Sequence, residues 1–393
     1  MIRRAVFWIH LVLGVAAGIF IFIMSATGVM LAFERQITNF VDRDLRSVSV
    51  PNSAQPRPVN DLLEMVRRAG VGEPTAMVVS NGPEAAMQFS FGRGKTIYVD
   101  PYSGAVLGPS SAATHDFFSV VERLHRTLGA PLGSKGAGHW LIGVSNLLFG
   151  ALILFGVVLW LPRRWGWKGL RASIAFRSGL RGKARDWNWH SVIGIWCAAP
   201  LFLIVLTGVV MSFGWANALL FRLSGSIPPV QGRGAGNQRM HGHDHRNGDE
   251  PNYERLLAVS KTFVPEWRTI TLNLVRAANA PVQVTVDAGT GGQPQKRTQY
   301  LLDRNTGAVL KRTAFTDGAL GPRLRSFVRF GHTGEWGGWA GQLIAAIASL
   351  GACVLVYTGL SLAIRRLIAR VKRKRNSNSD SEARSEQFLM ESH

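Results

Sequence analysis

The chain has 393 residues, of which 47% are hydrophobic, and its formal net charge is +21. A charge this large can indicate nucleic-acid binding, but here the basic residues flank long apolar segments, so we exclude nucleic acid as a partner. Both cysteines fall inside apolar segments, which excludes a disulfide framework of the kind found in small secreted proteins.

Four segments are apolar and long enough to cross a bilayer, which needs about 20 residues in a helix. They are residues 5–33, 138–161, 189–214 and 338–364. The basic residues collect in the loop 162–188, at the start of the tail 365–393, and at Arg3 and Arg4. With four spans, these three regions fall on one side, which the positive-inside rule makes the cytoplasm. We therefore expect a multi-pass protein in contact with membrane lipid, with both termini cytoplasmic.

The segment 34–137 lies between the first two spans, on the outer side. A helical spacing of apolar residues covers 59–69, and short strands are expected at 77–80, 87–91 and 96–100. A turn follows at Asp100, and residues 105–107 continue as a strand. This composition predicts a small α+β module.

The segment 215–337 repeats this order on the same side. A helix is expected at 253–263 and strands at 269–275, 282–287 and 298–303. The sequence D-x-x-[ST]-G-A-V-L occurs at Asp100 and again at Asp303. A Gly-, Pro- and His-rich insertion, residues 225–250, has no equivalent in the first module, and the polar tail 376–393 is predicted to be disordered.

The two halves therefore look like copies of each other. Each consists of a span, an α+β module and a returning span, so both halves share one orientation. The predicted fold class is a membrane α-helical protein: a four-helix transmembrane bundle with two small α+β modules, in a tandem parallel repeat.

One histidine lies in the first span and one lies at the matching place in the third. His10 precedes Gly14, and Thr27 with Gly28 follows 17 residues later; His190 precedes Gly194, with Thr207 and Gly208 at the same spacing. Histidine inside a membrane span is rare and points to function. Parallel repeats would bring the two imidazoles face to face, as axial ligands of a haem iron. The alternative is that the small residues serve only to pack helices.

Three further histidines are candidates on the outer side. His125 and His332 precede the second and fourth spans at nearly equivalent positions, and they are the candidate ligands of a second haem. His139, at the start of the second span, could replace His125; its repeat equivalent is Gln342, a poor ligand. In the insertion, His241, His243 and His245 alternate in HGHDH, which is typical of a divalent-metal site or of a solvated polar loop.

The patterns W/F-x-H-x3-G…T-G, L-H-x2-L and H-T-G-E, with the doubled D-x-x-[ST]-G-A-V-L, resemble the PepSY-associated transmembrane family. The resemblance covers residues 1 to about 370. It implies an iron-regulated protein of the Gram-negative inner membrane, with PepSY-like modules in the periplasm. By resemblance, the four histidines at 10, 190, 125 and 332 fall on the family's histidine positions. Characterised members include ferric-siderophore reductases that hold two non-covalent b-type haems, and the HGHDH loop is not a family feature.

Two functions follow as hypotheses. The first is a dihaem oxidoreductase that transfers electrons to a periplasmic ferric chelate, such as a ferric siderophore, and so releases ferrous iron. Its donor must be external, cytoplasmic or a quinol, because the soluble segments contain no dinucleotide or flavin fingerprint. The second is a haem-free membrane scaffold or regulator whose modules bind a partner protein.

Overall fold

The computed structural model of the chain describes residues 1–52, 55–92, 94–131, 136–162, 166–227, 250–274 and 280–391. The chain divides into two compact units. The first comprises Met1–Val29, Arg123–Ser212 and Ile344–His393, and the second comprises Met30–Glu122 and Phe213–Leu343.

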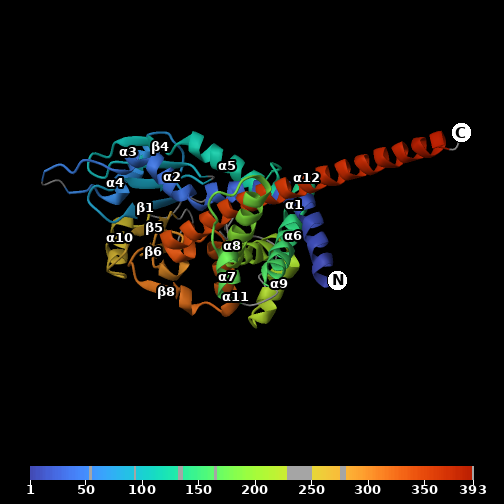
Figure 1. Cartoon of the computed structure of the whole chain (residues 1–393). Helices are drawn as coiled ribbons and strands as arrows, with labels where there is room; N and C mark the ends of the chain where they lie inside the picture. The colour runs from blue at the N-terminus through green and yellow to red at the C-terminus, as the bar shows by residue number, and fades with distance from the viewer. Residues whose placement is uncertain are drawn as a thin grey trace. The chain divides into compact units, whose positions relative to one another are not determined.

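Four long apolar helices dominate the chain (Figure 1). They are α1 (Ile2–Ala32), α6 (Ala137–Trp160), α8 (Gly182–Ser212) and α12 (Gly338–Glu391). Each is long and apolar enough to cross a membrane, with a mean hydropathy of 2.2 to 2.5 over its most apolar window. The four spans predicted from the sequence thus coincide with four helices.

Small residues let these helices approach closely. Cys197 and Leu201 of α8 pack on Ala348 and Ala352 of α12, and Ala17 and Ile21 of α1 pack on Leu152 of α6. Lipid tails are as apolar as leucine, so packing of this kind, and not hydrophobic exclusion, holds membrane helices together.

Polar contacts show which helix ends lie together. The Arg3 guanidinium of α1 donates to the main-chain carbonyls of Leu159 (2.7 Å) and Leu161 (2.5 Å), at the end of α6. The guanidinium of Arg370 lies 4.4 Å from the ring centre of Trp8. The start of α1 therefore lies beside the end of α6 and the basic part of α12, as an up-and-down arrangement requires.

Two segments are more helical than their sequences predicted. The helix α8 begins at Gly182, so the last part of the expected loop 162–188 is its first turns, and α7 (Trp167–Ile174) lies in the same loop. In the tail, α12 continues to Glu391 where a disordered segment was expected. Residues 365–391 contain no glycine or proline, so nothing in their sequence breaks a helix once the apolar part has formed.

The second unit contains one antiparallel sheet and several short helices. The strands are β1 (Ala76–Ser80), β2 (Met87–Ser90), β3 (Thr96–Val99), β4 (Val106–Pro109), β5 (Thr269–Asn273), β6 (Val282–Asp287), β7 (Arg297–Leu302) and β8 (Val309–Ala314). The helices are α2 (Glu34–Val41), α3 (Arg43–Arg46), α4 (Val59–Arg68), α9 (Gly214–Leu223), α10 (Tyr253–Lys261) and α11 (Leu320–His332), with 3-10 turns at Pro294–Lys296, Phe315–Asp317 and Glu335–Gly337. The helix α5 (Ala112–Thr127) leads from this unit into the first.

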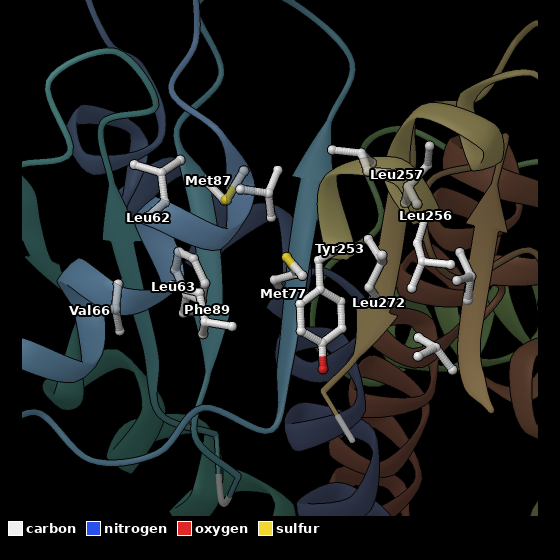
Figure 2. Packing of buried hydrophobic residues seen from close by; sticks show 14 of the residues in the cluster. Leu62, Leu63, Val66, Met77, Met87, Phe89, Tyr253, Leu256, Leu257 and Leu272 are labelled. Carbon is white, nitrogen blue, oxygen red and sulfur yellow. The ribbon is translucent and has the colours of Figure 1, made fainter. Parts of the chain in front are cut away.

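The two predicted α+β segments form a single sheet. Its order is β4-β3-β2-β1-β5-β6-β7-β8, and β1 pairs with β5 antiparallel, with Met77 opposite Leu272. One face is covered by α4 and α10. Figure 2 shows their side chains, among them Leu63 and Leu256, against Met77, Phe89 and Leu272 of the strands. The expected strands form as predicted, but their joining into one core was not foreseen.

The repeated D-x-x-[ST]-G sequence forms the same turn in both halves of the sheet. The Asp100 carboxylate accepts from the main-chain N–H of Tyr102, and the Asp303 carboxylate accepts from those of Asn305 and Thr306. The glycines that follow, Gly104 and Gly307, have φ of +78° and +73°, a conformation that residues with a side chain seldom adopt. Glycine is therefore required at both positions.

We expect Leu272→Ala to destabilise the sheet by about 2–5 kcal/mol, because it opens a cavity in the core where β1 meets β5. Leu272 is fully buried, whereas Leu310 of β8 is 58% exposed, so Leu310→Ala is the control. Thermal unfolding of the full-length protein in detergent measures the difference. Equal midpoints for the two variants would contradict a shared core at this position.

Candidate functional site

His10 of α1 and His190 of α8 face each other within the first unit. Their ring centres lie 6.2 Å apart and their ring planes are perpendicular. A metal–imidazole nitrogen bond is about 2.0–2.1 Å, so two imidazoles on opposite sides of one metal would have ring centres roughly 6 Å apart. The spacing therefore fits one iron between the two rings, and the pair predicted from the sequence is brought together.

Each of these rings lies against a glycine of a neighbouring helix. A Cβ atom at Gly156 of α6 would lie 3.5 Å from His10 Cε1, and one at Gly359 of α12 would lie 3.2 Å from His190 Cε1. The glycines singled out from the sequence, Gly14 and Gly194, instead face leucine side chains, Leu152 and Leu355. The residues that leave room for the imidazoles thus come from the other two spans.

The imidazole of His190 has a defined hydrogen-bond partner. Its Nδ1 lies 3.0 Å from Oγ1 of Thr358, and that hydroxyl donates to the main-chain carbonyl of Val354 at 2.8 Å. Because the single hydroxyl proton is directed to the carbonyl, the oxygen accepts from the ring, and we assign the proton of His190 to Nδ1. Nε2 then has a free lone pair, as a metal ligand needs.

His10 lacks such a partner. Its Nδ1 is buried and makes no hydrogen bond with the residues that the structure describes. The main chain of Leu152 interacts with the ring, but not at hydrogen-bond geometry. A buried polar atom without a partner is uncommon and costs free energy, so it calls for an explanation.

His125 of α5 is held in the same way as His190. Its Nδ1 lies 2.9 Å from Oγ1 of Thr27 on α1, and the Thr27 hydroxyl donates to the Ile23 carbonyl at 2.5 Å. A Cβ atom at Gly28 would lie 3.5 Å from His125 Cε1. The Thr27-Gly28 pair noted in the sequence thus contacts the ring of His125. This contact lies in the first unit, at the other end of α1 from His10.

The remaining candidates lie elsewhere. His332 is the last residue of α11 and belongs to the second unit, and His139 lies in the first turn of α6. The sequence equivalent of His139, Gln342, is buried and donates to the Ala32 carbonyl at 2.6 Å, at the end of α1. His241, His243 and His245 lie outside the described residues. Within the described part of the chain, no three His, Cys, Asp or Glu side chains gather as a metal-ion site.

A buried carboxylate lies one turn before His190 on α8. The Asp186 side chain is 1% exposed; it accepts from the Ser361 hydroxyl of α12 at 2.8 Å and pairs with the Arg185 guanidinium at 2.9 Å. Asp186 is the single acidic residue of the basic segment 162–188, and that feature of the sequence could have identified it. Ser361 and Thr358 gave no such signal, because isolated hydroxyl residues are common in membrane helices and only the packing shows what they contact.

The fold and this site define a multi-pass membrane protein that buries imidazoles between its apolar helices. Residues 7–366 match the family described as the PepSY-associated TM region, and the chain belongs to that family. No curated protein matches the sequence.

We expect Gly359→Ala to lower the thermal midpoint relative to Gly194→Ala. Both substitutions favour helix formation equally, but the new Cβ at 359 crowds the His190 ring at 3.2 Å, whereas the one at 194 makes ordinary contact with Leu355 at 3.7 Å. Unfolding of both variants in the same detergent provides the comparison. A midpoint for Gly359→Ala at or above that of Gly194→Ala would show that the His190 ring is free to move.

Proposed function

We propose that this protein is an inner-membrane electron-transfer protein with two non-covalent b-type haems, and that it reduces a ferric chelate in the periplasm. The observation that carries the proposal is the His10–His190 pair, with ring centres 6.2 Å apart inside an apolar helix bundle. When bound, haem supplies one-electron exchange between ferric and ferrous iron. The chain's own residues would bind and orient the haem.

The donor set suits haem better than a bare metal ion. A haem iron takes four ligands from its own ring and needs only two from the protein, which matches a pair of imidazoles. A divalent cation would need more ligands, and in the described residues no third His, Cys, Asp or Glu joins the pair. His10 and His190 would hold the inner haem through Nε2.

A second haem is proposed with His125 and His332 as ligands. The Thr27 hydroxyl lies 2.9 Å from Nδ1 of His125 and so orients this ring, which supports His125 as the ligand in preference to His139. From His10 to Thr27 is 17 residues, or about 25 Å along α1. The two ligand sets would thus lie near opposite faces of the bilayer, as electron transfer across it requires.

The proposed orientation and repeat rest on sequence and on matched contacts. Basic residues flank the ends of the helices near His10, which supports a cytoplasmic location for those ends. His10 on Gly156 and His190 on Gly359 are equivalent pairs, which supports a tandem parallel repeat. The sheet of the second unit, with its PepSY-like halves, would then face the periplasm.

In this location the second unit could receive the ferric chelate, such as a ferric siderophore. Reduction of its iron from ferric to ferrous weakens the attraction to hard oxygen donors and releases the metal. The electron donor would be a cytoplasmic reductant or a quinol. The His241–His245 loop would be an accessory site for a divalent metal.

A haem-free scaffold or regulator, with the sheet binding a partner protein, is the competing function. It gives no role to two imidazoles that face each other inside the membrane, where histidine is costly. We therefore favour the electron-transfer function.

We expect the purified protein to bind two haems and His190→Ala to bind one, because the variant removes a ligand of the inner site only. Haem is counted by pyridine haemochrome, and a reduced-minus-oxidised spectrum identifies the b type. His115→Ala is the control, since its side chain is exposed on α5. A colourless protein after expression with ample haem would refute the function, and unchanged haem content in His190→Ala would refute the ligand assignment.

We expect His332→Ala to stop reduction of ferrioxamine while the inner haem can still be reduced. This variant removes a ligand of the proposed periplasmic haem and leaves His10 and His190 in place. The measurement is stopped-flow absorbance of the dithionite-reduced protein mixed with the chelate. Chelate reduction at the wild-type rate would rule out a terminal haem at His332.

A further inference from the structure

A Thr-Gly dipeptide contacts a histidine ring at two places in the apolar helices. Thr27-Gly28 holds His125, and Thr358-Gly359 holds His190: in both, the threonine oxygen meets Nδ1 at 2.9–3.0 Å and the glycine leaves room for Cε1. A third such dipeptide, Thr207-Gly208, occupies the place in α8 that Thr27-Gly28 occupies in α1. In this pattern, a threonine oxygen that accepts a hydrogen bond from the imidazole stands next to a glycine that leaves space for the ring.

His10 lies against a glycine of this kind, but no threonine precedes that glycine. It lies on Gly156 as His190 lies on Gly359, but the residue before Gly156 is Phe155, and a phenyl ring accepts no conventional hydrogen bond. This explains why Nδ1 of His10 is buried without a hydrogen-bond partner among the residues that the structure describes. The main-chain interactions with Leu152 and Leu355 occur at both rings, so they do not distinguish them.

We propose that Thr358 and Phe155 are positioning residues that make the two axial ligands of the inner haem unequal, with His190 as the fixed ligand and His10 as the replaceable one. The proposal rests on the function proposed above. An Nδ1–H donated to oxygen fixes the ring orientation and makes Nε2 a stronger donor. His10 has neither advantage, so it would be the weaker of the two ligands when haem is bound.

As a consequence, a neutral diatomic ligand such as carbon monoxide would be able to replace His10 on the α1 side of the inner haem. Carbon monoxide would take the place of His10 as a ligand of the bound ferrous haem, with no change of oxidation state, while the Thr358 hydroxyl would keep His190 in position. His125, held by Thr27, has the threonine partner that His10 lacks.

Carbon monoxide titration of the dithionite-reduced, full-length protein tests this directly. We expect the wild type to bind it at one of its two haems. Phe155→Thr supplies a hydroxyl that can accept a hydrogen bond from His10. Phe155→Val has nearly the same shape as the threonine variant but lacks the hydroxyl. Carbon monoxide affinity should be about tenfold lower in Phe155→Thr than in Phe155→Val, in line with the usual effect of a ligand's hydrogen-bond partner.

The second measurement is the midpoint potential of the inner haem. Thr358→Val removes the acceptor of His190, weakens its donation to ferric iron and should shift the potential to a more positive value. Thr358→Ser keeps the hydroxyl and should restore the wild-type potential. A purely structural role of Thr358 would move the thermal midpoint but not the potential.

The outcomes separate this inference from the function on which it rests. A wild type without haem overturns both. Two haems with no carbon monoxide binding, equal affinity in the two Phe155 variants, or a wild-type potential in Thr358→Val overturn only the inequality of the ligands. The electron-transfer function would survive each of those three results.

Discussion

The structure depends on the requirement that an imidazole buried among apolar helices must find both space and a polar partner in a neighbouring helix. Glycines at 28, 156 and 359 provide the space, and the hydroxyls of Thr27 and Thr358 provide the partner for His125 and His190. Because these contacts tie α1 to α5 and α8 to α12, they hold the helices together as well as orienting the rings. The contacts that orient these imidazoles thus also contribute to the packing of the helices.

Outside the apolar helices, a different constraint shapes the second unit. An α+β module of four short strands has an unpaired edge and a small core. Pairing β1 with β5 removes one edge from each half and merges two cores into one, with Met77 beside Leu272 at the junction. The remaining edge strands are β4 and β8. This unit therefore presents one continuous sheet and not two separate modules.

The proposed cofactor site is symmetrical in position but not in chemistry. His10 and His190 occupy matched places on α1 and α8 and lie on matched glycines, yet only His190 has a hydroxyl partner. In the proposed site, one difference between matched positions, Phe155 in the place of Thr358, would be enough to distinguish the two ligands of a single iron.

The amino-acid sequence was enough to predict the four spans, the strands of each half of the sheet and the candidate histidines, because each depends on local composition or spacing. It also carried the Thr27-Gly28 signal, but not the histidine that this pair holds. Tertiary structure decided which residues meet: His125 with Thr27, His190 with Thr358, Asp186 with Ser361, and β1 with β5. The physical reason is that each of these contacts joins segments at least 98 residues apart along the chain, and no local pattern encodes the partner.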